Sequence, residues 1–185
     1  MYSAVMEPGD FKDLLEVACG STNPLNLILR GGSVQRFHSE GRHFRQDVAQ
    51  HTWRVMVILR YLWPQTSPDA LLVALYHDVG EALTGDVPAP IKRNQAIRSA
   101  VRSADDQFTC FIGMPGEREL STVEYNRMKC ADYIEMCFTC LDTPGREAKR
   151  VYDNGVKFIK EAAARLGGAD EEKVLNFIKD RFPDA

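Results

Sequence analysis

Residues 74–81 read Ala-Leu-Tyr-His-Asp-Val-Gly-Glu, an apolar helical pattern that three ionisable side chains interrupt: His77, Asp78 and Glu81. Burying a charge costs several kcal/mol, roughly, unless the charge is paired or bound to a metal. His51 and Asp132 interrupt two other apolar patterns in the same way. Two imidazoles and two carboxylates form a mixed ligand set that suits one divalent transition metal. On spacing alone, buried core histidines and surface aspartates explain these residues equally well.

The size and composition of the chain are those of one globular domain. The chain has 185 residues, of which 44% are hydrophobic and 26% charged, and we expect a single domain over residues 1–185. The net charge of −3 argues against a nucleic-acid-binding surface, because duplex binding depends mainly on neutralising phosphates. The sequence contains neither a secretory signal nor an apolar run of membrane-spanning length. The chain has five cysteines, an odd number. We therefore predict that they are reduced thiols in the core and that the protein is cytoplasmic.

Helical periodicity dominates the chain, and no set of alternating strands is evident. Gly31-Gly32 predicts a turn, and the polar stretch Ser33–Asp47 predicts an irregular segment. Ser67 and Pro68 predict a helix start, as N-cap and first helical residue. We expect helices over Asp10–Cys19, Val48–Trp63, Ser67–Leu83, Ala96–Phe111, Leu120–Leu141, Arg146–Leu166 and Asp170–Phe182. The predicted fold class is therefore an all-α helical bundle, with Trp53 and Trp63 packed in its core.

These helices place the ionisable residues so that they can meet. His51 lies one turn into its helix, and Glu81 follows His77 by four residues, which puts both on one helix face. Asp132 lies within another helix. Three helices with inward-facing ligands are a common way to build a metal centre in a bundle.

The flanking sequence adds a more specific signal. The pattern His51…His77-Asp78…Asp132 resembles the HD-domain superfamily of metal-dependent phosphohydrolases. The stretch from His77 to Lys92, with its His-Asp-x-x-Glu and Thr-Gly-Asp-x-Pro elements, resembles the YfbR-like 5′-deoxynucleotidase branch, as do Val48-Ala49-Gln50-His51-Thr52 and Val34-Gln35-Arg36-Phe37-His38. The resemblance implies an HD domain with its metal-binding core over about residues 34–141 and further helices over 146–182.

The resemblance also implies a role for each matching residue. His51, His77, Asp78 and Asp132 would hold one Co²⁺, Mn²⁺ or Zn²⁺ ion, and Glu81 and Asp86 would lie beside the attacking water and the scissile ester. Arg36 and Lys92 would bind phosphate, and Phe37, Ser39 and Pro90 would approach the sugar or base. Phe37 stands where the family pattern has Trp, which leaves the base preference open. Without the resemblance, Lys92 fits a solvated helix start equally well, and Asp86 fits a turn cap.

Two substrates remain open, and so does a class without catalysis. The compact Gly31–His38 element resembles phage dATP triphosphohydrolases and favours release of deoxynucleoside and triphosphate. A 5′-deoxynucleotidase, which releases orthophosphate from a monophosphate, is the alternative. A non-catalytic nucleotide sensor or scaffold is more remote, because neither a ligand nor Glu81 is lost. A binuclear HD or di-iron site needs further histidines, and none follows His77. By resemblance we also expect a homo-oligomer in a bacterial or phage-infected cell.

Overall fold

The computed structural model describes residues 8–37 and 45–182, and helices account for most of these residues. In chain order they are α1 (Pro8–Cys19), α2 (Pro24–Gly32), α3 (Val48–Leu62), α4 (Pro68–Tyr76), α5 (Glu81–Thr84), η1 (Ile91–Arg93), α6 (Gln95–Phe111), η2 (Glu117–Glu119), α7 (Thr122–Leu141), α8 (Arg146–Leu166) and α9 (Gly168–Arg181), where η denotes a 3-10 helix. The described residues include no β-strand, only one isolated bridge between Gln35 and Asp47. The prediction of an all-α fold is confirmed.

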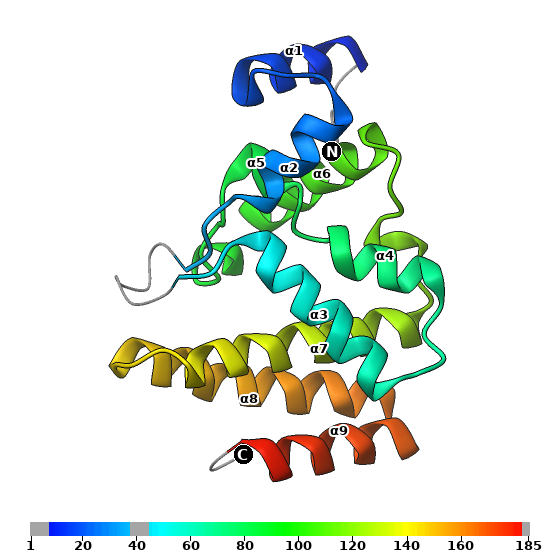
Figure 1. Cartoon of the computed structure of the whole chain (residues 1–185), viewed down its shortest axis with the longest axis vertical. Coiled ribbons are helices and arrows are strands. Elements are labelled where there is room, and N and C mark those ends of the chain that lie inside the picture. Colours follow the sequence, from blue (N-terminus) through cyan, green and yellow to red (C-terminus); the bar gives the residue numbers. More distant parts are fainter. Residues whose placement is uncertain (1–7, 38–44, 183–185) are drawn as a thin grey trace.

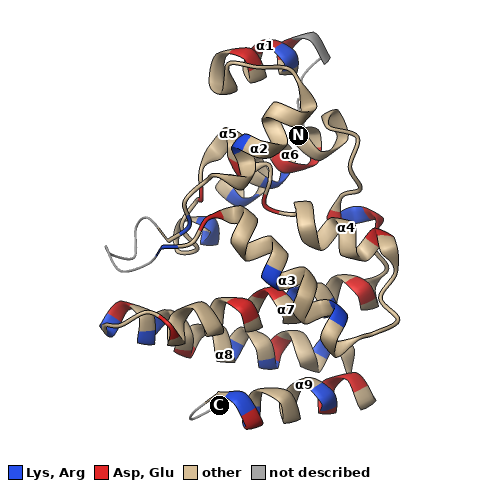
Figure 2. Cartoon of the chain, in the orientation of Figure 1, with Lys and Arg blue, Asp and Glu red and all other residues tan. Residues whose placement is uncertain are grey.

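The lower layer of the molecule is a bundle of four long helices with α4 beside it. The helices α7 and α8 run antiparallel, α9 packs on α8, and α3 crosses α7 (Figure 1). Apolar side chains from these helices form one continuous core, which includes Leu59, Ile134, Ile159 and Ile178. Charged residues of both signs lie along α8 and α9 (Figure 2), as expected of amphipathic helices with one face in solvent.

The upper layer has a smaller core of its own, built by α1, α2, α6 and the segment after α4. Leu15, Leu27 and Phe108 are fully buried in it, together with Val79. Val73 and Ala74 of α4 belong to the lower core instead. The segment between Ala74 and Val79, which carries His77 and Asp78, therefore lies where the two cores meet.

The helix predicted over Ser67–Leu83 starts as expected but is not continuous. The Ser67 hydroxyl accepts a hydrogen bond from the Ala70 amide at 3.2 Å, which confirms the N-cap. The prediction that the helix runs on to Leu83 is wrong, since α4 ends at Tyr76 and α5 begins at Glu81. Helix α6 packs directly against the intervening turn: a Cβ atom at Gly80 would lie 2.5 Å from an oxygen of Asp105. The break between α4 and α5 therefore allows α6 to pack closely against Gly80. The helical pattern of the sequence does not reveal this contact.

The prediction of a turn at Gly31-Gly32 is also wrong, because both glycines belong to the last turn of α2. Asn23 caps this helix by accepting hydrogen bonds from the amides of Leu25 and Asn26, and Pro24 occupies its first turn. A Cβ atom at Gly31 would lie 2.3 Å from the carbonyl oxygen of Val79. This glycine therefore permits close approach of α2 to the turn after α4.

The irregular segment predicted between Ser33 and Asp47 is confirmed for its described residues. Its two ends are tied together, since the Arg36 amide donates to the Gln46 carbonyl at 2.8 Å and the Val48 amide donates to the Val34 carbonyl at 3.0 Å. Arg36 is thereby held beside the start of α3. None of the described helices has the length and apolar character needed to cross a bilayer.

Candidate metal centre and substrate site

The two predicted histidine ligands meet with their Nε2 atoms facing the same space. The Nδ1 atom of His51 lies 2.5 Å from Oε2 of Glu135, and Nδ1 of His77 lies 2.9 Å from the Ala74 carbonyl oxygen. An imidazole that donates from Nδ1 has its lone pair on Nε2. Both Nε2 atoms are buried without a hydrogen-bond partner among the described residues. Buried imidazole lone pairs without a donor are what a metal site requires.

Two carboxylates complete the set. Oδ1 of Asp132 lies 3.3 Å from Nε2 of His51, while the oxygens of Asp78 lie 3.5 Å from that atom and 3.6 Å from Nε2 of His77. One ligand atom each from His51, His77 and Asp132 lies within 4.8 Å of the others. The four residues predicted as ligands therefore converge, and their donor set fits one divalent transition metal.

The charges around the site favour a cation at its centre. Burial alone would raise the pKa of Asp132, but the Lys129 ammonium, 3.2 Å from its carboxylate, holds that pKa well below its usual range. Burial would likewise raise the pKa of Asp78, yet nearby positive charge, that of His77 when it is protonated and that of Arg36, lowers this pKa. Both carboxylates are therefore ionised and able to bind a metal.

Glu135 is a buried residue of this cluster that the sequence analysis did not single out. Besides His51, its carboxylate accepts hydrogen bonds from Nε2 of Gln46 at 2.7 Å and from the Thr139 hydroxyl at 2.8 Å. Glu135 has no exposed surface. It follows Asp132 by three residues on α7, inside the apolar run from Ile134 to Cys137, so the criterion that selected Asp132 would also have selected Glu135.

The two residues predicted beside the reacting ester lie close to the ligands but in different surroundings. Glu81 is buried, and burial followed by the charge of Asp78 raises its pKa to about 9. Its Oε1 atom lies 3.9 Å from Nζ of Lys92, which brings these two predicted residues together. The Asp86 carboxylate accepts a hydrogen bond from the Phe37 amide at 2.7 Å. Asp86 thus joins the turn after α5 to the segment that carries Arg36.

The structure describes four of the five predicted substrate-binding residues. Arg36 forms an ion pair with Asp78, so its guanidinium stands at the edge of the metal centre. It also lies over the Phe37 ring, 5.4 Å from the ring centroid. Pro90 is exposed just before η1, and Ser39 lies outside the described residues.

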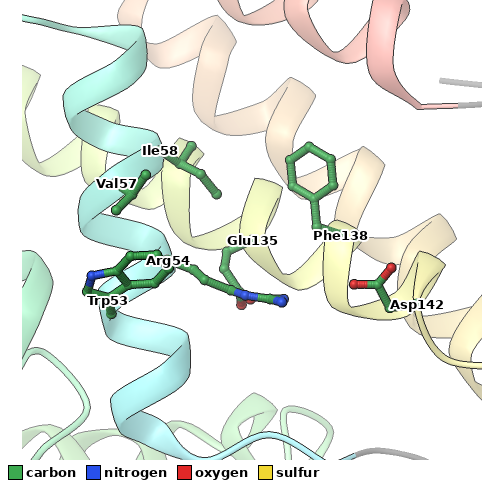
Figure 3. A pocket seen from close by; sticks show the side chains of 7 residues that line it. All are labelled: Trp53, Arg54, Val57, Ile58, Glu135, Phe138 and Asp142. Carbon is green, nitrogen blue, oxygen red and sulfur yellow. The ribbon is translucent and has the colours of Figure 1, made fainter.

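Two cavities adjoin this network. One, of about 340 Å³, is lined by His77, Asp78 and Lys92 together with residues of α6, η2 and α7. The other, of about 260 Å³, lies between α3 and α7, and Glu135 is part of its lining (Figure 3). There the Arg54 side chain extends to within 3.5 Å of Glu135. Trp53, also part of that lining, is 56% exposed, so the prediction that it packs in the core is wrong, whereas Trp63 is buried as predicted.

Comparison with known proteins identifies the family. A model of the YfbR-like 5′-deoxynucleotidases matches residues 25–184. The chain belongs to this family. The resemblance inferred from the His51…His77-Asp78…Asp132 pattern and its flanking motifs is thereby confirmed.

Individual relatives come from phages and bacteria. A dATP triphosphohydrolase of Acinetobacter phage SH-Ab 15497 is 29% identical over 131 residues, which cover 60% of this chain and 63% of that protein. The chain thus aligns with less than two thirds of that enzyme. A 4′-phosphooxetanocin A phosphatase of Priestia megaterium is 24% identical over 139 residues, covering 64% of this chain and 72% of the phosphatase.

A solved structure has the same fold. It is the HD phosphohydrolase DatZ of cyanophage S-2L, bound to dA and one catalytic Zn²⁺ ion. It superimposes with a TM-score of 0.70 at 20% identity and covers 83% of this chain and 93% of its own. The HD helical fold is therefore the fold of this family member.

Proposed function

We propose that the chain is a metal-dependent hydrolase of 2′-deoxynucleotides that cleaves the ester between O5′ and the α-phosphorus. The observation that carries this proposal is the pair of buried Nε2 atoms, on His51 and His77, that face the carboxylates of Asp78 and Asp132 without a donor. In a purely structural cluster of neutral imidazoles, both Nε2 lone pairs would face carboxylate oxygens with no donor between them, at a cost of about 1–3 kcal/mol for each unsatisfied atom.

Within the proposed site, His51, His77, Asp78 and Asp132 hold one divalent ion, of which Zn²⁺, Mn²⁺ and Co²⁺ suit the donors. When bound, such an ion polarises a phosphoryl oxygen and lowers the pKa of water from 15.7 toward ~7. Support for a resident metal comes from DatZ, which was solved with Zn²⁺.

The chain's own residues supply the remaining steps. Arg36, at the edge of the centre, orients the α-phosphate through its planar fork of donors. The buried Glu81 carboxyl moves a proton between the water and the leaving O5′ atom, assisted by Asp86. Lys92, whose Nζ atom lies 3.9 Å from Oε1 of Glu81, balances the negative charge of the bound phosphate. Phe37, Ser39 and Pro90 contact the sugar or base.

A deoxynucleoside triphosphate such as dATP is the preferred substrate in this proposal, with deoxynucleoside and tripolyphosphate as products. The phage relative, a dATP triphosphohydrolase, favours it. A monophosphate is the second candidate, favoured by the Priestia phosphatase and by the name of the family. Free nucleotides, rather than nucleic acid or a membrane, are the proposed partners. We also propose that the chain forms one domain and assembles as a homo-oligomer in the cytoplasm. Light scattering that gives a monomer would refute the assembly.

Metal reconstitution tests the proposed function. Protein stripped of metal and reloaded with Zn²⁺, Mn²⁺ or Co²⁺ is given dATP, dAMP and ATP, and the products are separated by chromatography. Release of deoxynucleoside that depends on the metal supports hydrolysis at O5′. A protein that binds nucleotide but releases no product with any metal would instead be a sensor or scaffold.

A further inference from the structure

The cavity of about 340 Å³ beside the candidate metal centre has no assigned occupant. His77 and Asp78 belong to its lining, so the cavity is continuous with the site of the proposed reaction. Among the described residues that line it, none is a proposed sugar or base contact: Phe37 and Pro90 are absent. The cavity therefore suits the part of a substrate that lies beyond the α-phosphate.

Five cationic side chains line this cavity: Lys92, Arg98, Arg102, Arg118 and Lys129. Three of them already face acids. Arg118 pairs with Asp106, and Glu117 lies 3.1 Å from Lys129 and 3.7 Å from Arg102. Their charges are largely balanced within the protein.

Arg98 and Lys92 differ from these three. The Nε atom of Arg98 donates to the Lys92 carbonyl at 2.9 Å, which holds the two residues together. No acid lies within ion-pair distance of Arg98 in residues 8–37 and 45–182, and Lys92 reaches only Glu81, at 3.9 Å. Asp105 also lines the cavity, but burial raises its pKa to about 7 and so reduces its negative charge. The cavity thus holds an excess of positive charge at Lys92 and Arg98.

We propose that this cavity is a polyphosphate-tail site, in which Arg98 and Lys92 bind the outer phosphates of a nucleoside triphosphate. The proposal rests on the proposed function and deepens it by naming the residues that would select a triphosphate over a monophosphate. With the α-phosphate at His77 and Asp78, the β- and γ-phosphates extend along α6 toward Arg98. The guanidinium fork suits two phosphate oxygens at once. A monophosphate has no group that reaches Arg98.

The first test compares substrates on one set of variants loaded with Co²⁺. Arg98→Ala is expected to raise KM for dATP by at least about tenfold, as loss of a charge-assisted hydrogen bond does, and to leave KM for dAMP unchanged. Arg98→Lys, which keeps the positive charge but not the planar guanidinium fork, should reverse part of the increase in KM for dATP. Arg93→Ala is the matched control, because Arg93 is exposed on η1 and does not line the cavity. Equal effects on dATP and dAMP, or none on either, would overturn the tail site.

The second test is independent of catalysis and so separates this proposal from the proposed function. Titration calorimetry measures binding of inorganic tripolyphosphate and of orthophosphate to metal-free protein, since tripolyphosphate would sequester the metal. The wild-type protein should bind tripolyphosphate more tightly, and Arg98→Ala should weaken that binding by at least about tenfold. Equal affinities for both anions, or an unchanged affinity in Arg98→Ala, would refute the site even if nucleotides are hydrolysed.

Discussion

Oε2 of Glu135 lies 2.5 Å from Nδ1 of His51, and neither side chain has exposed surface. This contact favours the tautomer of His51 with its proton on Nδ1, which leaves the Nε2 lone pair for the metal centre. Gln46 and Thr139 hold the carboxylate in turn. The orientation of His51 therefore depends on residues that need not touch metal or substrate.

Glu135→Gln should weaken metal binding without unfolding the protein. An amide oxygen still accepts the His51 proton, but the negative charge that makes the imidazole a better donor is lost. Loss of such a partner typically costs about 10–100-fold in metal affinity. Competition with a chelator measures the change, and Glu161→Gln, on the exposed face of α8, is the control. Wild-type affinity in Glu135→Gln would mean that the contact has no role in metal binding.

Asp78→Asn should abolish both metal binding and turnover. An amide is a weaker ligand than a carboxylate, and the ion pair with Arg36 is lost as well. Metal content after reconstitution and dialysis gives the result, with Asp69→Asn, an exposed residue in the first turn of α4, as the control. An Asp78→Asn protein that keeps its metal and its activity would remove Asp78 from the ligand set.

Glu81→Gln should retain the metal and lose about 10²-fold or more in kcat, which is the usual contribution of a general acid or base. The amide can keep hydrogen bonds but cannot transfer a proton. Glu172→Gln, exposed on α9, serves as the comparison. An unchanged kcat would show that proton transfer does not pass through Glu81.

Gly31→Ala should destabilise the fold, because the new methyl group would lie 2.3 Å from the Val79 carbonyl oxygen. Backbone atoms cannot move aside cheaply, and overpacking of this kind costs about 1–3 kcal/mol. Gly32→Ala is the neighbouring control, where the nearest atom is the Ala49 methyl at 3.2 Å. Denaturant unfolding compares the two. Equal stabilities for both variants would show that α2 can shift away from the turn.

The sequence predicts which residues converge at the candidate metal centre, because each of them breaks an apolar pattern on its own segment. His51, His77 and Asp132 converge as expected, and most long helices have nearly their predicted bounds. Such residues are recognisable locally, because a charged side chain among apolar neighbours must be paired or bound to a metal wherever the segment is buried.

What the sequence does not reveal depends on contacts between distant segments. The break after Tyr76 could not be predicted, because Val79, Ala82 and Leu83 continue a helical pattern and only the packing of α6 on Gly80 shows the turn. The two glycines at the end of α2 suggested a turn, because the close contact that explains Gly31 is likewise made with a distant segment and is not visible in the local sequence. Gln46 meets Glu135 across 89 residues, and no local signal in its polar segment marks it.

Hydrolysis of dATP and dAMP in H₂¹⁸O tests most directly whether water attacks the α-phosphorus and O5′ leaves. With metal-loaded protein we expect deoxyadenosine without label and the heavy oxygen in the released tripolyphosphate or orthophosphate. Label in the 5′-hydroxyl of deoxyadenosine, cleavage of dATP to dAMP and pyrophosphate, or no product from either nucleotide would contradict the proposed reaction.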